Sequence, residues 1–129
     1  MWNYLPQAIT FSFERLKNAQ IECMDALTLI ERYNHKDTLI YCDPPYLREL
    51  RKKNMYQYEM GDDTHKQLLE ILRSSKAKII LSGYDNEMYN EYLSDWNTDI
   101  IKTTAQFGKK RTEKIWYNFD NPIYYYTLI

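Results

Sequence analysis

The chain has 129 residues, which is enough for a single domain with a real core but short for an enzyme with two lobes. Its formal net charge of -1 excludes a global basic field for attracting nucleic acid, so that function would have to rest on local patches. No apolar run approaches membrane-spanning length, the start lacks a signal-peptide pattern, and three glycines provide no Gly-x-Gly-x-x-Gly loop for phosphate.

The two cysteines, Cys23 and Cys42, each lie in an apolar run that is typical of a strand. Their spacing is not that of metal ligands, so we expect no metal site. We expect both to be reduced, buried thiols in a cytoplasmic protein.

The first third of the chain predicts two helices with a short strand between them. Residues 4–18 form the first predicted helix, with Pro6 in its first turn. Residues 19–23 are a strand candidate, and residues 25–33 are the second predicted helix. Asp25 begins that helix, where a lone acid is more often a cap than a ligand contact.

The most informative stretch is a β-branched and aromatic run, residues 38–42, that ends at Asp43-Pro44-Pro45-Tyr46. The run predicts a buried strand, and the two prolines prevent any ladder or helix from continuing. The Asp43 carboxylate and the Pro44 carbonyl then remain as acceptors at the carboxyl end of a strand, beside the Tyr46 ring. Ligands bind at that edge of open α/β sheets. Two acceptors beside a ring suit a flat molecule with an amino group, whereas the alternative is an ordinary strand end with a rigid turn.

The rest of the chain alternates helices with strands. Asp62-Asp63-Thr64 is expected to supply an N-cap, and Gly83 to remove bulk where the backbone nears a ligand. We expect Met88, Tyr92 and Trp96 to be core residues. The predicted elements are a helix over 62–75, a strand over 78–82, a helix over 86–96, and strands over 99–107 and 113–119. This order is typical of the second half of a doubly wound α/β sheet.

Two local basic stretches are candidates for contact with a polyanion that has exposed bases. The first is interleaved with tyrosines, but a solvated loop would have the same composition. The second is a predicted hairpin turn, which would be charged in any case. The residues concerned are Arg48, Arg51, Lys52 and Lys53 in the first stretch, and Lys109, Lys110 and Arg111 in the second.

From about Trp2 to Phe119 the chain resembles the Dam-type N6-adenine-specific DNA methyltransferases, and phage or prophage members above all. The Asp43-Pro44-Pro45-Tyr46 corner is the specific motif. The other landmarks agree in order and spacing: Arg15-Leu16-Lys17, Ile21-Glu22, Asp25-Ala26, His65, Leu68-Leu69, Ser82-Gly83-Tyr84, Tyr89, Trp96, Arg111, Glu113, Trp116 and Asn118.

The resemblance implies methyl transfer from S-adenosylmethionine to the N6 amino group of an adenine flipped out of double-stranded DNA. Asp43 and the Pro44 carbonyl would accept the two amino protons, and Tyr46 would stack on the base. Asp25 would lie near the adenosine of the cofactor. Transfer would be direct, so Cys42 is not a nucleophile. Enzymes that methylate other amino groups usually carry serine or asparagine in place of Asp43, and one side chain leaves those alternatives open.

The resemblance also implies an incomplete sheet. In the family, a glycine-rich cofactor turn, the acid for the ribose and most of the DNA-recognition segment precede the matching region. The family strand order is 3-2-1-4-5-7-6, and the chain supplies strands 3 to 7. We therefore expect the C-terminal portion of a Rossmann-like, S-adenosylmethionine-dependent methyltransferase sheet, with the central N-terminal strands absent and residues 120–129 as a tail.

Strand 4, which carries Asp43, would then have an exposed apolar edge. Self-association or an N-terminal complementing half would cover that edge. On this reading the chain is the C-terminal part of an enzyme and is a poor catalyst alone. The alternative is a non-catalytic DNA-binding or interaction remnant of such an enzyme.

Overall fold

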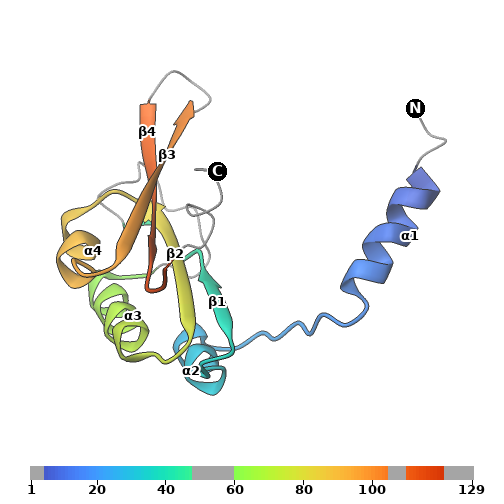
Figure 1. Ribbon diagram of the computed structural model, residues 1–129, viewed down its shortest axis with the longest axis horizontal. Helices are drawn as coiled ribbons and strands as arrows, with labels where there is room; N and C mark the ends of the chain where they lie inside the picture. Colours follow the sequence, from blue (N-terminus) through green and yellow to red (C-terminus); the bar gives the residue numbers. More distant parts are fainter. Residues whose placement is uncertain (1–4, 48–59, 105–109, 121–129) are drawn as a thin grey trace, which may run out of the picture.

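The computed structural model describes residues 5–47, 60–104 and 110–120, which form a mixed α/β fold around an open four-stranded sheet (Figure 1). The strand order is β1-β2-β4-β3, with β1 parallel to β2 and both other pairs antiparallel. The strands are β1 (Leu39–Cys42), β2 (Lys78–Tyr84), β3 (Asn97–Thr104) and β4 (Lys110–Tyr117). The last strand therefore lies between its two predecessors.

The described residues form four helices beside the sheet: α1 (Leu5–Leu16), α2 (Ala26–Arg32), α3 (Asp62–Ser74) and α4 (Glu87–Tyr92). α3 contacts both α2 and α4. α1 stands apart from the sheet in Figure 1, at the end of an extended segment. Its apolar side chains Ile9, Phe13 and Leu16 are exposed. The predicted first helix is confirmed by α1. Its apolar stripe, however, packs against no described part of the chain.

The core lies between the sheet and helices α3 and α4. Leu68, Leu69 and Leu72 recur at helical spacing and place the buried stripe of α3 where the sequence predicted it. They pack with Leu81 of β2 and with Trp116 of β4, both fully buried. Met88, Tyr92 and Trp96 are partly buried against the same cluster, in agreement with the prediction that they are core residues.

Tyr89 and His65 form a polar pair inside this core. The Nδ1 atom of His65 lies 2.8 Å from the hydroxyl of Tyr89, which joins α3 to α4. Burial raises the pKa of Tyr89 above its usual value, because a charged phenolate would lose its solvation in the core. The landmark residues His65 and Tyr89 thus stabilise the packing of two helices.

β2 separates a core face from an open face. Ile79, Leu81 and Gly83 are buried, and Ser82 and Tyr84 alternate with them on the other side. The Cβ of an alanine at position 83 would meet ring carbons of Trp116 and Tyr89 in the core. The missing side chain of Gly83 therefore faces the core, and a ligand near its backbone stays a prediction.

Residues 19–23 were expected to be a strand and are not one. Ile21 is 97% exposed and Cys23 is exposed, so the expectation of a buried Cys23 thiol is also wrong. A strand requires a partner for its ladder, and this segment pairs with no described strand. Glu22 instead accepts hydrogen bonds from Arg32 at 2.7 Å and from Tyr33 at 2.9 Å, which ties the segment to the end of α2.

β1 is an edge strand within the described sheet, because β2 is the neighbour with which it pairs. Leu39 and Tyr41 are 58% and 62% exposed, whereas Ile40 and Cys42 pack against the core. The prediction of a buried strand therefore holds for one face only. The exposed edge expected for the strand that carries Asp43 is present in this part of the chain.

Two helix boundaries also differ from expectation. The N-cap of α3 is Gly61, which has no side-chain capping bond, so Asp62 and Asp63 lie in the first turn and not at the cap. There their charges favour the positive end of the helix dipole. α4 ends at Tyr92, before the predicted Trp96. None of the helices in the described ranges is long and apolar enough to cross a membrane.

Candidate active site

Asp43 follows β1 directly, at the carboxyl end of the two parallel strands. The register pairs Cys42 with Leu81, so the next residues along each strand, Asp43 and Ser82, become neighbours. The hydroxyl of Ser82 donates to Oδ1 of Asp43 at 3.0 Å. The predicted edge of the sheet therefore holds an exposed carboxylate that a second strand contacts through a side chain.

Tyr46 completes the corner after two partly buried prolines. Its ring lies on that of Tyr84, with centroids 4.1 Å apart and planes inclined by 35°. Tyr84 ends β2, so the aromatic pair joins the segment that follows β1 to the end of β2. An aromatic pair of this kind holds a ring in place more firmly than a lone side chain in a loop.

Tyr41, Ser82 and Asp43 form a chain of hydroxyl and carboxyl groups on the open face of the sheet. The Tyr41 hydroxyl donates to Oγ of Ser82 at 3.1 Å. Oγ of Ser82 also lies 3.2 Å from the carbonyl oxygen of Cys42. The Cys42 side chain points toward the core, where burial raises its pKa to about 11. A neutral thiol agrees with the expectation that Cys42 is not a nucleophile.

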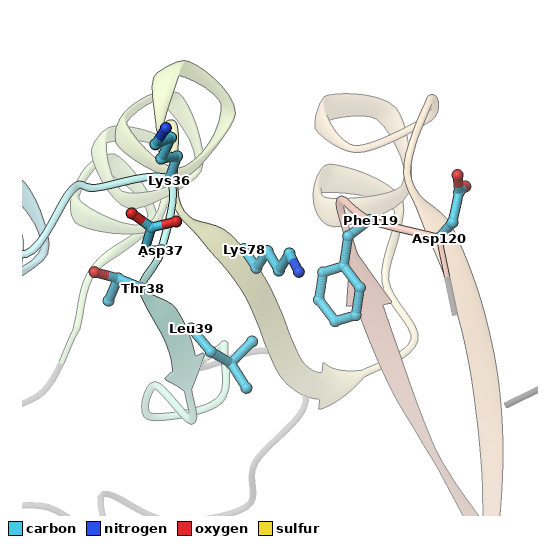
Figure 2. Close-up of a pocket in the computed structure, with 7 residues that line it drawn as sticks. All are labelled: Lys36, Asp37, Thr38, Leu39, Lys78, Phe119 and Asp120. Carbon is cyan, nitrogen blue, oxygen red and sulfur yellow. The ribbon is translucent and has the colours of Figure 1, made fainter. Parts of the chain in front are cut away.

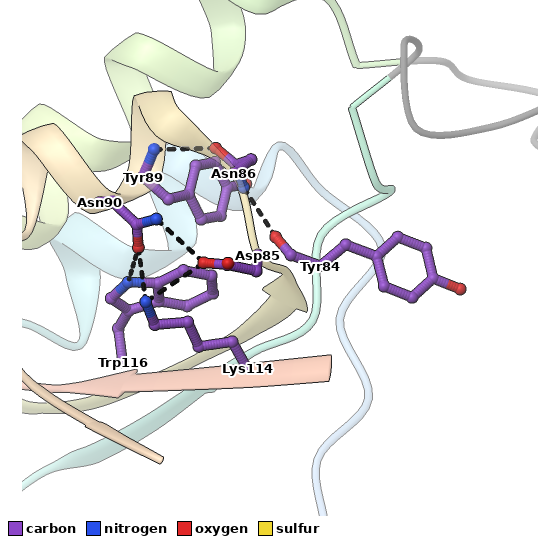
Figure 3. Close-up of polar contacts among 7 residues, drawn as sticks. All are labelled: Tyr84, Asp85, Asn86, Tyr89, Asn90, Lys114 and Trp116. Carbon is purple, nitrogen blue, oxygen red and sulfur yellow. Dashed lines mark hydrogen bonds and ion pairs between the residues drawn. The ribbon is translucent and has the colours of Figure 1, made fainter. Parts of the chain in front are cut away.

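A second polar cluster lies just beyond the end of β2 (Figure 3). Asn90 donates to Asp85 at 2.9 Å, and Nζ of Lys114 contacts Asp85 at 3.2 Å and Asn90 at 2.7 Å. The hydrogen bond from Asn90 has the largest effect on Asp85 and, together with the bond and the charge of Lys114, holds the pKa of Asp85 below its usual value. The indole of Trp116 donates to Asn90 at 3.3 Å and lies under the Lys114 ammonium.

Asn86 connects this cluster to the aromatic pair. Its side chain caps α4 by accepting from the backbone of Tyr89 at 2.8 Å and donates to the Tyr84 carbonyl at 2.8 Å. The Tyr84 ring extends away from the cluster in Figure 3. The backbone that carries Tyr84 is therefore fixed on one side while its ring is presented to Tyr46.

Asp25 is an N-cap. Its Oδ2 accepts from the backbone N–H of Thr28 at 2.9 Å and from the Thr28 hydroxyl at 3.1 Å. This is the commoner of the two roles considered for a lone acid at a helix start. A role near the adenosine of a cofactor stays a prediction.

Most of the predicted DNA-contacting residues lie outside the described ranges. Arg48, Arg51, Lys52, Lys53 and Lys109 lie outside the described residues, as does the tail from residue 121 onward. Lys110 and Arg111 belong by their backbone to β4 and not to a turn.

The larger of two described pockets lies at the opposite end of the strands from Asp43. It has a volume of about 620 Å³, and Thr38, Leu39, Lys78 and Phe119 are among its lining residues (Figure 2). The smaller pocket, of about 340 Å³, lies between the starts of α3 and α4 and includes Leu47, the residue after Tyr46. Neither is lined by Asp43, so the corner is a candidate site because of its chemistry and not because of the size of a pocket. Groups of three or more His, Cys, Asp or Glu suited to a metal ion do not occur among the described side chains.

A family model for the D12 class N6 adenine-specific DNA methyltransferases matches residues 3–108. The chain belongs to this family. The match covers the Asp43 corner, strands β1, β2 and β3, and helices α1 to α4. Comparison with curated proteins finds no match. The D12 class is an enzyme family whose substrate is adenine in DNA.

Two contacts at this corner were not predicted from the sequence. Ser82 was noted as a landmark but its contact with Asp43 was not foreseen, and the same holds for Tyr84 and Tyr46. Ser82 and Tyr84 stand two residues apart at the end of the strand that follows β1 along the chain, so they lie on one face of the sheet, and this spacing was the available signal. The cluster around Lys114 left no such signal, because β4 reaches it from a distant part of the sequence.

Proposed function

We propose that the chain forms the target-base part of an S-adenosylmethionine-dependent DNA adenine N6-methyltransferase. The observation that carries this proposal is the corner at the carboxyl ends of β1 and β2, where Asp43 and the Tyr46–Tyr84 ring pair lie within a chain of the D12 class. A carboxylate next to a ring suits a flat base with an amino group.

In this proposal, Asp43 and the Pro44 carbonyl accept the two amino protons of a flipped adenine. Both acceptors together fix the plane of the amino group and leave its lone pair directed at the methyl donor. Pro45 keeps the backbone extended, and Tyr46 stacks on the base. Catalysis by these residues consists of positioning and electrostatic stabilisation, without a covalent bond to the enzyme.

S-adenosylmethionine would supply an electrophilic methyl group. Among the described residues, Asp25 is the one proposed to lie near it, but its carboxylate already caps α2, and neither described pocket includes Asp25. The described residues therefore fit the target base better than the cofactor. We assign the contact with double-stranded DNA to the basic residues between positions 48 and 53 and between 109 and 111.

We further propose that residues 1–129 are the C-terminal portion of a Rossmann-like methyltransferase domain, with residues 120–129 as a tail. The order β1-β2-β4-β3 corresponds to strands 4-5-7-6 of the family order given above. The exposed edge of β1 then pairs with a strand from an N-terminal complementing half or from a second copy.

Methyl transfer from labelled S-adenosylmethionine to unmethylated duplex DNA tests the proposal, first with the chain alone and then with an N-terminal half of a D12 class enzyme. We expect Asp43→Ala to lower the rate by about 10²–10³-fold, a loss typical of removing one preorganised polar group. Asp37→Ala is the matched control, because Asp37 is an exposed aspartate at the other end of β1.

The two variants are also compared in DNA binding at several salt concentrations. We expect affinities within about twofold of each other, because phosphate contacts dominate binding. Unchanged methyl transfer by Asp43→Ala would refute the proposed site. Salt-dependent DNA binding without methyl transfer under any of these conditions would favour the non-catalytic remnant.

A further inference from the structure

We propose that Ser82 is a positioning residue that orients the Asp43 carboxylate for the target amino group, and that Tyr41 holds the Ser82 hydroxyl in place. This inference rests on the function proposed above. It adds two residues, from two different strands, to a site otherwise confined to one corner.

The hydroxyl of Ser82 has one proton and two acceptors within reach. Oδ1 of Asp43 is at 3.0 Å and the carbonyl oxygen of Cys42 is at 3.2 Å. The bond to the carboxylate is the shorter of the two and is assisted by charge, so the proton is directed to Asp43 when that group is ionised. Tyr41 donates to the same oxygen at 3.1 Å and so occupies one of its lone-pair directions.

Asp43 needs such a support because of where it lies. It is exposed, follows the last residue of an edge strand, and precedes two prolines that carry no backbone N–H. Packing therefore restrains its carboxyl group little, and the bond from Ser82 limits its rotation. A carboxylate oxygen has room for more than one donor, so the bond to Ser82 does not compete with an amino proton.

Packing in the core does not require a hydroxyl group at position 82. Ser82 lies on the open face of β2, opposite the core face of Leu81 and Gly83. The three side chains of the relay, Tyr41, Ser82 and Asp43, come from the paired ends of β1 and β2. An alanine would fill the same place in the strand and would remove only the relay.

The experiment measures kcat and KM for methyl transfer to duplex DNA, with the full chain and, where transfer requires it, the N-terminal half used above. We expect Ser82→Ala to lower kcat by about 10–100-fold, as is typical when the support of a reacting group is lost, with both KM values within about twofold. Ser82→Thr keeps the hydroxyl and should restore kcat to within about threefold of the parent. Tyr41→Phe should lower kcat by about 3–10-fold.

Ser74→Ala is the matched control, because the Ser74 hydroxyl donates to the carbonyl of Ile71 in its own helix at 3.0 Å. Ser74 ends α3, before the start of β2, whereas Ser82 lies near the other end of that strand. Its kinetics should equal those of the parent. The double variant of Tyr41→Phe with Ser82→Ala should be no slower than Ser82→Ala, because both changes break the same relay.

The outcomes separate this inference from the function on which it rests. If Asp43→Ala abolishes transfer and Ser82→Ala has the kcat of the parent, the positioning role is wrong and the proposed function stands. If Asp43→Ala is as active as the parent, both are wrong. If Ser82→Ala does not fold by circular dichroism, Tyr41→Phe decides: a kcat equal to that of the parent overturns the inference, and the expected loss supports it.

Discussion

Asn118 joins the end of β4 to the start of β2, and its removal is expected to destabilise the sheet. Its Oδ1 accepts from the backbone N–H of Ile79 at 2.8 Å, and its Nδ2 donates to the carbonyl of Ala77 at 3.0 Å. Ile79 is fully buried and Ala77 is 2% exposed. Both bonds lie beyond the last backbone pair of the two strands, Ile80 with Tyr117.

Asn118→Ala leaves a buried N–H and a buried carbonyl without these partners. An unsatisfied buried donor costs about 1–3 kcal/mol and a lost hydrogen bond about 1 kcal/mol, so the free energy of unfolding should fall by about 2–4 kcal/mol. That is a large share of the total for a domain of this size, which is about 5–15 kcal/mol.

Urea denaturation followed by circular dichroism measures the change. With an m-value of about 2 kcal/mol/M, the midpoint should fall by about 1–2 M. Asn97→Ala is the matched control, because the exposed Asn97 side chain donates one bond, at 3.0 Å, to the carbonyl of Phe119. Its effect should stay within about 0.5 kcal/mol.

Equal midpoints for the two variants would refute the reasoning. Such a result would mean that water replaces Asn118 at Ile79 and that the buried backbone groups are not left unsatisfied. A change in m-value without a change in midpoint would instead indicate an altered unfolded state.

Two further predictions concern residues at the carboxyl ends of the strands. Gly83→Ala should change the free energy of unfolding by less than about 1 kcal/mol, because its methyl group would meet two ring carbons at 3.6 Å, an ordinary contact; a loss above about 2 kcal/mol in thermal unfolding would contradict this. Cys42 should react with iodoacetamide far more slowly than the exposed Cys23 at pH 8, because a pKa of about 11 leaves about a thousandth of its thiol ionised; equal labelling by mass spectrometry would argue against burial of the thiol. Burial raises the pKa of the Cys42 thiol from 9.0 to about 11, so above pH 9 the thiol ionises more readily in the unfolded chain than in the folded one. The contribution of this thiol to the free energy of unfolding is therefore fully present below pH 9 and is lost as the pH rises toward about 11.

The local signals in the sequence located most of the elements. The prolines after Asp43 set the end of β1, and the leucines of α3 at helical spacing set its buried face. Such signals depend on residues a few positions apart, whose backbone geometry and periodicity act within one element. For the same reason the Asp43 corner could be recognised as a candidate site from four consecutive residues.

Contacts between distant parts of the chain were decided by the tertiary structure. Residues 19–23 have the composition of a strand but pair with no described strand, and Gly83 faces the core although it stands next to the site. The bonds from Ser82 to Asp43 and from Lys114 to Asp85 join residues 39 and 29 positions apart. Strand pairing and register create these neighbours, and neither is encoded in a short stretch of residues.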